Sequence, residues 1–462
     1  MDLRTIVTVE PVVFLYLMSG FLNSFAVQQL VLVKVCEELH FKKEVCSNFS
    51  HNSQESLMIQ SKASYVMLLY VAVLSFLSIP MSILLGAWSD QGGRKLGMIL
   101  PCVGALIGGV TLIVMVCVKE MSVYWCILAS ALIAIFGNYA VIFLSVLSYI
   151  SDITNVEDRT KYNGIVEAMI YIGGTVGFLL SGWLFQSFTL TYCFGVYCGC
   201  QVLTICYVLL WLKESSHSSE RMHLSDETPL DSTGRTLKMA LLLYASRTWK
   251  TFSKAREGQN RLKLYLIFFC GTLISVCSTG EQAILILFLT LPPQHFSPEL
   301  YGVYNAMKMF LGGAVLVGLF PLLLRCIKEI TLAKLGALLR VISFILLAFS
   351  TNTWMAFLSA VMNSFSGFPG PVLRSMASSV VEQNEQGAMY SCIASIDTIC
   401  IIIGSSAFYA LYPETLSTLP GFSFIVMAGF QVILLILVQW LSEIPTSHHP
   451  LIDAENRNTT EE

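Results

Sequence analysis

The chain has 462 residues, of which 55% are hydrophobic and 12% are charged, and its formal net charge is −3. A soluble domain carries about 25% charged residues, so this composition excludes a disordered protein, a nucleic-acid-binding protein and an ordinary cytosolic enzyme. The mean hydropathy of +0.69 predicts a protein whose outer surface lies in a lipid bilayer. The fourteen cysteines lie mostly within apolar runs, where they act as small hydrophobic side chains.

Twelve apolar runs meet the criterion of about 20 residues for a membrane-spanning helix. These runs do not alternate as the strands of a membrane barrel do, so we predict an all-α membrane protein with twelve transmembrane helices. Two six-helix halves, 1–213 and 263–442, are joined by a polar linker, 214–262, and followed by a polar tail, 443–462. The predicted spans are 11–34, 64–89, 96–118, 122–150, 163–185, 190–212, 264–290, 301–324, 330–350, 353–377, 388–411 and 420–441.

Basic residues gather in every second loop, which indicates the loops that face the cytosol. Both termini are therefore expected in the cytosol and the loop 35–63 on the opposite, luminal or external side. That loop contains the sequon Asn48-Phe49-Ser50, so we predict glycosylation of Asn48. The basic residues that set this orientation are Arg94 and Lys95, Arg159 and Lys161, ten Lys or Arg from Lys213 to Lys263, and Arg325 and Lys328.

The segment GAWSDQGGRK, residues 86–95, is the most specific local motif. Its glycines permit a tight turn, and Asp90 can accept hydrogen bonds from the start of the next helix. We expect Asp90 and Arg94 to act in conformational gating. The alternative is a basic turn that serves topology alone.

This motif resembles the loop between helices 2 and 3 of the major facilitator superfamily. The whole chain further resembles solute carrier family 46, whose members are proton-coupled carriers of folates and of steroid conjugates and bile acids. The resemblance implies two related six-helix bundles around a central cavity, and it leans toward the lysosomal carriers of steroid conjugates. The stretches that carry it are VEPVVFL (9–15), GAWSDQGGRK (86–95), FGNYA (136–140), PVLRSMASSVV (371–381), NEQGAMYSCIA (384–394) and PGFSF (420–424).

Charged residues within membrane spans are costly and are therefore candidate functional residues. Glu167 matches the family position implicated in proton coupling. Asp152 matches a family aspartate, and it lies fifteen residues before Glu167, which is the separation that the family shows. An apolar surrounding favours the protonated form of a carboxyl group, as a proton carrier requires. For both residues a structural pairing is the alternative.

Two further charges are candidates in the second half. Arg374 matches a family arginine implicated in substrate binding, and its guanidinium suits a carboxylate or sulfate. Glu281 matches a family aspartate. In the family a histidine precedes that aspartate, and Val276 occupies the histidine position in this chain. None of the seven histidines lies within a predicted span, so carboxylates must carry any proton. Glu281 is therefore a further candidate for proton coupling, and we expect it to pair with either Lys308 or Arg374.

Uncharged polar residues on helices 1, 4 and 10 are candidate substrate contacts: Gln29, Asn138 and Asn363. Hydrogen bonds between helices, worth about 1 kcal/mol each, would explain them equally well. Close helix packing is sufficient to explain Gly173 and Gly177. The family resemblance places Cys46 in a loop disulfide whose usual partner is missing here, which leaves Cys36 as a substitute partner.

The sequence thus predicts a secondary transporter that moves a small organic anion with a proton from the lysosome to the cytosol. The family resemblance implies amphipathic substrates such as steroid sulfates, bile acids or muropeptide-like catabolites. We expect a monomer without metal, cofactor or nucleic-acid partner. A folate-type proton symporter at the plasma membrane is one alternative. A non-transporting receptor or scaffold on a transporter fold is the other.

Overall fold

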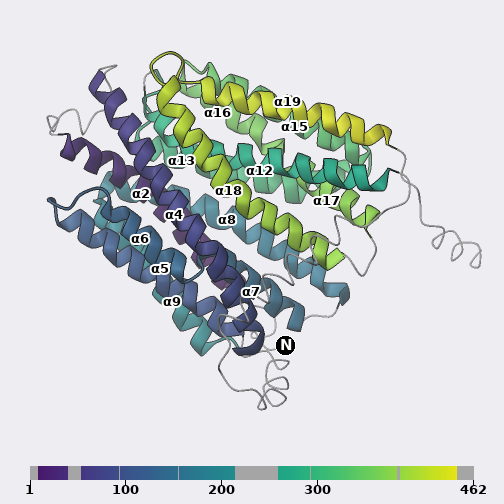
Figure 1. The fold of residues 1–462 in the computed structure, drawn as a ribbon, viewed down its shortest axis with the longest axis horizontal. Coiled ribbons are helices and arrows are strands. Elements are labelled where there is room, and N and C mark those ends of the chain that lie inside the picture. The colour runs from purple at the N-terminus through teal and green to yellow at the C-terminus, as the bar shows by residue number, and fades with distance from the viewer. Residues whose placement is uncertain are drawn as a thin grey trace, which may run out of the picture.

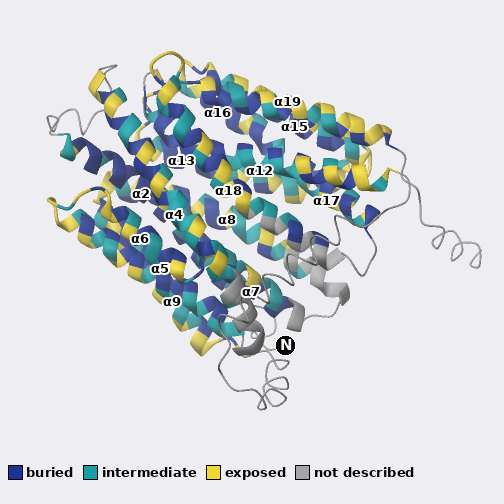
Figure 2. Ribbon diagram, in the orientation of Figure 1, coloured by how far each residue is buried: buried dark blue, intermediate teal, exposed yellow. Residues whose placement is uncertain are grey.

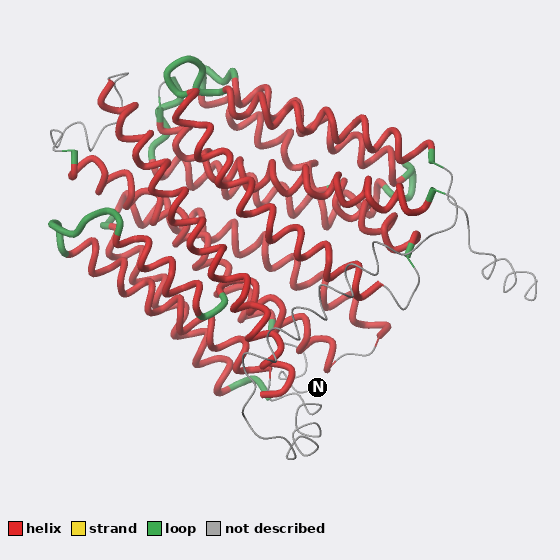
Figure 3. Tube along the Cα trace, in the orientation of Figure 1, coloured by secondary structure: helices red, strands yellow, loops and turns green. Residues whose placement is uncertain are grey.

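The structure of the protein is a computed structural model that describes residues 9–39, 54–92, 94–153, 156–213, 259–291, 293–381 and 386–444. These residues are helical apart from short connections, and no strand occurs within the described ranges (Figure 3). The predicted all-α class is therefore confirmed. The helices form two groups that correspond to the two halves of the chain (Figure 1).

The first half supplies six spans, of which the fourth consists of two helices. The spans are α2 (Glu10–Glu38), α4 (Gln54–Gly92), α5 (Arg94–Cys117), α6 (Trp125–Ile135) with α7 (Asn138–Ile153), α8 (Val156–Ser187) and α9 (Leu190–Leu210).

The second half repeats this number, again with an interrupted fourth span. The spans are α12 (Asn260–Thr290), α13 (Pro298–Gly313) with η1 (Ala314–Leu319) and α14 (Phe320–Leu323), α15 (Glu329–Ala348), α16 (Thr353–Asn363) with η2 (Ser364–Gly367) and α17 (Pro369–Val380), α18 (Gln386–Thr415) and α19 (Phe422–Glu443). Judged by the length and composition of their described residues, ten of the twelve spans are long and apolar enough to cross a membrane. The other two are the α16–η2–α17 span, which is broken into short pieces, and α18.

The first loop is shorter than the sequence analysis predicts. α2 continues to Glu38 and α4 already begins at Gln54, whereas we predicted a loop over 35–63. Polar residues support these extra turns: Lys62 Nζ donates to Glu38 Oε2 at 3.0 Å. The helices thus extend beyond the apolar runs that define the membrane spans.

The fourth span of each half is interrupted near its middle. In the first half, Gly137 has a φ of 88° and Asn138 a φ of 50°, a left-handed conformation that glycine and asparagine adopt most readily. In the second half, η2 is a 3₁₀ turn, and Pro369 at the start of α17 lacks the amide hydrogen that a continuous helix needs. The predicted continuous helices over 122–150 and 353–377 are therefore each two helices.

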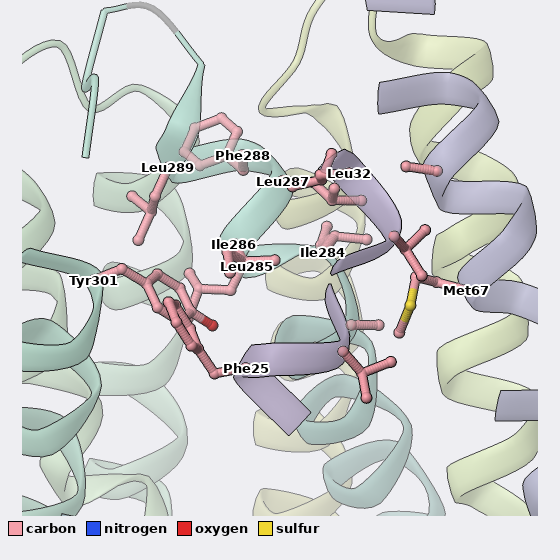
Figure 4. Close-up of a cluster of buried hydrophobic side chains, with 14 of the residues drawn as sticks. Phe25, Leu32, Met67, Ile284, Leu285, Ile286, Leu287, Phe288, Leu289 and Tyr301 are labelled. Carbon is pink, nitrogen blue, oxygen red and sulfur yellow. The ribbon is translucent and has the colours of Figure 1, made fainter. Parts of the chain in front are cut away.

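The two ends of the bundle differ in how the halves meet. We call the end where α2 ends and α4 begins the first-loop end, and the end where α9 ends and α12 begins the linker end. At the first-loop end, one cluster of buried apolar side chains draws on both halves. Figure 4 shows part of it, where Phe25 and Met67 of the first half lie near Ile284, Leu287 and Tyr301 of the second.

At the linker end, each half has its own apolar cluster. Val9, Met98 and Ile150 belong to the cluster of the first half, and Leu264 and Leu434 to that of the second. A shared core at one end and separate cores at the other define a conformation that is closed at the first-loop end. The two helix groups correspondingly diverge toward the linker end in Figure 1.

Hydrogen bonds between α4 and α18 reinforce this closure. Ser64 Oγ donates to the Tyr409 carbonyl at 2.7 Å, and the Tyr412 hydroxyl donates to Gln60 Oε1 at 3.2 Å. All four residues are buried. The first-loop end is therefore closed by polar pairs as well as by apolar contacts.

α8 packs very closely against helices of both halves. A Cβ atom at Gly177 would lie 2.4 Å from the Met18 carbonyl oxygen of α2, and one at Gly302 of α13 would lie 2.6 Å from the Phe178 carbonyl oxygen. Neither position can hold a larger residue without a backbone shift. The close packing predicted for Gly173 and Gly177 is confirmed, and Gly302 extends it to the second half.

The outer surface is apolar along the spans. Phe76 is 74% exposed, Phe310 61% and Ile436 62%. Exposed residues follow outer helices such as α9 and α19, whereas buried residues lie between helices (Figure 2). Such a large apolar surface suits contact with lipid chains, so the molecule is a multi-pass membrane protein.

Candidate functional site

Glu167 and Arg374, which the sequence analysis singled out separately, form one ion pair. Glu167 lies on α8 of the first half and Arg374 on α17 of the second, and Arg374 Nη1 is 3.6 Å from Glu167 Oε1. Their side chains are 56% and 50% exposed. The pair therefore bridges the two halves near the linker end, in a place that water can reach.

Two tyrosines lie near this ion pair. The charge of Glu167 acts on the hydroxyls of Tyr139 of α7 and Tyr171 of α8, and that of Arg374 acts on Tyr171 as well. Tyr139 stacks on Phe143 with a centroid distance of 5.4 Å. The carboxylate thus lies beside aromatic side chains that can accept or donate hydrogen bonds and can contact an apolar ligand.

A second ionic site lies within the second half. Glu281 of α12 accepts from Lys308 of α13 through Oε1 and from Arg340 Nη2 of α15 through Oε2, the latter at 2.6 Å. The side chains of Glu281, Arg340 and Lys308 are 3%, 7% and 15% exposed. We call these three residues the buried ion cluster.

Further contacts fix Arg340 within the cluster. Its Nη1 donates to Ser366 Oγ of η2 at 3.3 Å, and its guanidinium lies 4.5 Å from the centre of the Phe344 ring. A small cavity of about 10 Å³ beside it is lined by polar atoms of Ser278 and Gln431 as well. Arg340 therefore links the buried ion cluster to the interruption of the tenth span.

The structure decides between the two partners that we considered for Glu281. Lys308 is a partner, and Arg374 is not, because Arg374 pairs with Glu167 across the halves. The sequence analysis assigned no role to Arg340, although its position within an apolar run was the available signal. The neighbouring Gln282 is exposed, while Glu281 is buried inside the second half.

The two asparagines predicted as substrate contacts flank the interruptions of the fourth spans. Asn138 begins α7, and its Oδ1 accepts from the Tyr16 hydroxyl at 3.5 Å. Asn363 ends α16 and is buried, and its Oδ1 has no hydrogen-bond partner among the described residues. Interrupted helices at matching positions of two halves commonly line transporter binding sites.

Gln29 lies apart from these groups, toward the first-loop end of α2. It is buried, and its Nε2 has no hydrogen-bond partner in the described part of the chain. An unsatisfied buried donor of this kind suits either a ligand or an internal water molecule.

Several predicted residues lie outside the part that the structure describes. These are Asn48 and Cys46, together with the side chains of Asp90 and Asp152. Arg94 is described and begins α5. Cys36 takes part in a disulfide, as expected if Cys46 is its partner.

One hydrogen bond to a charged side chain was not predicted from the sequence. Ser275 Oγ of α12 donates to Asp397 Oδ1 of α18 at 2.6 Å. Both residues belong to the second half, so this bond holds two helices of one half together. Within the described ranges, no group of three or more His, Cys, Asp or Glu side chains could hold a metal ion.

Comparison with known proteins begins with a family model described as the Major Facilitator Superfamily, which matches residues 12–330. The lysosomal proton-coupled steroid conjugate and bile acid symporter SLC46A3 of Gallus gallus is 29% identical over 457 residues, covering 95% of this chain and 94% of that protein. The proton-coupled folate transporter of Rattus norvegicus is 26% identical over 447 residues, covering 96% and 93%. The predicted resemblance to solute carrier family 46 is therefore confirmed.

Solved structures show the same fold at low sequence identity. The peptide transporter POT in complex with sulfate aligns with a TM-score of 0.64 at 14% identity, over 94% of each chain. The human organic anion transporter MFSD10 aligns with a TM-score of 0.61 at 16% identity, over 93% of this chain and 98% of that one. The predicted arrangement of two six-helix halves is thus confirmed.

Proposed function

Because the chain belongs to the Major Facilitator Superfamily, we propose that it is a proton-coupled symporter of small organic anions. Members of this superfamily are transporters and not enzymes. The similarity to two proton-coupled carriers over more than nine-tenths of the chain supports proton coupling. The named substrates of SLC46A3, steroid conjugates and bile acids, define the proposed substrate class.

The observation that carries this proposal is the ion pair between Glu167 and Arg374. The pair joins the two halves at the end where their cores are separate. Protonation of Glu167 removes its negative charge and releases Arg374 for the anionic group of a substrate. Neutralising both groups also lowers the cost of moving them as the halves reorient.

Residues around the pair fit an anionic substrate with an apolar body. Tyr139 and Tyr171 offer aromatic side chains near the Glu167 carboxylate. Asn138 and Asn363, at the interruptions of the fourth spans, offer amide groups for polar parts of the substrate. Alternating access then means closing the linker end and opening the first-loop end.

The charge distribution supports the proposed orientation in the membrane. Arg94 and Lys95 begin α5, and Arg325 and Lys328 lie between α14 and α15, so these basic residues lie at the linker end. The positive-inside rule places that end in the cytosol. A proton gradient across an acidic organelle would therefore drive export to the cytosol, and we propose the lysosomal membrane as the location, with the plasma membrane as the alternative.

The test is uptake of a labelled steroid sulfate by cells that carry the protein at their surface, at acidic and at neutral external pH. We expect faster uptake at acidic pH, because protonated Glu167 is the loaded form. Glu167→Gln should abolish the pH dependence and concentrative uptake. The matched control is Glu443→Gln, which changes an exposed glutamate of α19 bonded to Gln439 and should leave uptake intact.

Three outcomes would contradict the proposal. Uptake that is unchanged by external pH and by Glu167→Gln would indicate a uniporter. Surface expression with no uptake of steroid sulfates, bile acids or folates at either pH would favour the receptor or scaffold alternative. Faster uptake of folates than of steroid sulfates would favour the folate-type alternative.

A further inference from the structure

The buried ion cluster contains an excess of positive charge. Glu281 is its one carboxylate, and both of its oxygens are in use, Oε1 by Lys308 and Oε2 by Arg340. Among the described residues, the charges that act on Lys308 are Glu281, which attracts it, and Arg340, which repels it. An uncompensated charge in a membrane interior is costly, so an additional anion would be stabilised there.

The two cations are not equally available to such an anion. Arg340 is held by Glu281, by Ser366 at 3.3 Å and by the face of Phe344 at 4.5 Å. Lys308 is the most exposed member of the cluster, and the contact that the structure gives it is the one to Glu281. A lysine ammonium has three N–H donors, so Lys308 retains donors for a ligand.

Lys308 also lies on the face of α13 that meets the first half. Tyr301, two helical turns earlier, stacks on Phe25 of α2 with a centroid distance of 5.6 Å. Gly312, one turn later, lies against Tyr171 of α8, where a Cβ atom would be 3.5 Å from Tyr171 Cε1. Lys308 is thus placed between the closed first-loop end and the tyrosine beside the Glu167–Arg374 pair.

The side chains next to Lys308 are apolar and adaptable. Met309 reaches Gly174 of α8, with its Cγ 3.1 Å from the position of a Cβ there. Phe21 Cε2 lies 3.2 Å from the same Cβ position, and the Phe21 ring centre is 5.3 Å from that of Phe178. Methionine and aromatic side chains of this kind suit a bulky hydrophobic ligand of variable shape.

We propose that Lys308 binds the anionic group of the substrate at the deep end of the site, with Glu281 as its resident partner. This inference rests on the proposed function and deepens it by assigning a second cation to substrate binding. The ligand class is an amphipathic molecule with a sulfate or carboxylate group. The anionic group then contacts Arg374 first, near the linker end, and Lys308 afterwards, deeper in the protein.

The experiment measures thermal unfolding of the purified full-length protein with increasing concentrations of a steroid sulfate, a bile acid, or the uncharged parent steroid. Lys308→Met removes the excess charge and leaves Glu281 paired with Arg340, so the variant should unfold at the same temperature as the wild type or higher. Lys334→Met is the matched control, because Lys334 bonds Gln439 and Ser442 near the protein surface.

We expect an anion to raise the unfolding temperature of the wild type and of Lys334→Met, and the uncharged steroid to have less effect. In Lys308→Met, half-maximal stabilisation should need about tenfold more anion or above, which corresponds to about 1.4 kcal/mol or more. Equal stabilisation of Lys308→Met and wild type by the anion would overturn the inference and leave the proposed function intact.

Three other outcomes bear on the inference, and the first separates it from the proposed function. Stabilisation by an anion that is lost in Lys308→Met would support the inference even if cells showed no uptake, because binding is measured without transport. A lower unfolding temperature of Lys308→Met, with anion binding unchanged, would make Lys308 a structural residue and overturn the inference. Failure of the sulfate and of the bile acid alike to stabilise the wild type would also overturn it.

Discussion

Two glutamates of this protein form ion pairs in opposite settings. Glu281 is buried within one half and bonds two cations of the same half, whereas Glu167 is exposed and meets Arg374 across the two halves. The three helices of the buried ion cluster can move together when the halves reorient. The Glu167–Arg374 pair joins the two halves, so its geometry has to change in the same movement.

This difference separates a charge that maintains structure from a charge that responds to transport. A buried carboxylate with two bonded cations cannot lose its charge without leaving those cations uncompensated. An exposed carboxylate can exchange a proton with water at little structural cost. Proton coupling is therefore expected at Glu167, and the role proposed for Glu281 in proton coupling becomes one of holding Lys308 and Arg340.

The largest effect should come from removing the charge of Glu281. Glu281→Gln preserves the shape of the side chain but leaves Lys308 and Arg340 buried without a carboxylate. We expect the free energy of unfolding to fall by about 3–5 kcal/mol, measured as denaturation of the purified protein in detergent. A loss below about 1 kcal/mol would show that the two glutamates do not differ as described.

An intermediate effect is expected for Arg340→Lys. The lysine keeps the positive charge beside Glu281, but it cannot also reach Ser366 and cover Phe344 as a planar guanidinium does. We expect a loss of about 1–3 kcal/mol in unfolding free energy, from the same denaturation measurement. Ser366→Ala is the companion variant, and its loss should be part of the loss in Arg340→Lys.

The smallest effect on stability should come from Glu167→Gln. Exposed ion pairs contribute about 0–1 kcal/mol, so we expect a change of less than about 1 kcal/mol in the unfolding free energy, although proton-coupled uptake is lost. Added salt should reduce even this small change, because it screens exposed charges. A large destabilisation by Glu167→Gln would remove the contrast with Glu281.

The sequence was sufficient to predict the fold class and the number of spans, and it offered Lys308 as one of two partners of Glu281. Apolar runs define the spans, because each must cover the bilayer with hydrophobic side chains. The extension of α4 back to Gln54 could not be read in this way, since it is polar and lies beyond the apolar run. Nor could the interruption at Gly137 and Asn138, where two positive φ angles decide the geometry.

The pairing of Glu167 with Arg374 also required the structure. The two residues are far apart in the sequence and belong to different halves, so their distance depends on how the halves are arranged. Arg340 shows the same limit within one half. The sequence shows that Arg340 is a charged residue within an apolar run, but its pairing with Glu281 depends on how the helices of the second half are arranged.

The closed first-loop end has a consequence for how temperature and salt act on the protein. Its opening would expose apolar side chains such as Phe25 and Leu287 to water, a change with a positive heat capacity. Apolar contacts weaken on cooling, so cooling should increase the fraction of molecules that are open at this end. The Glu167–Arg374 contact at the opposite end depends on charge and responds to ionic strength instead. The two ends of the carrier thus respond to different physical variables. Temperature and ionic strength can therefore shift the balance between its conformations without mutation.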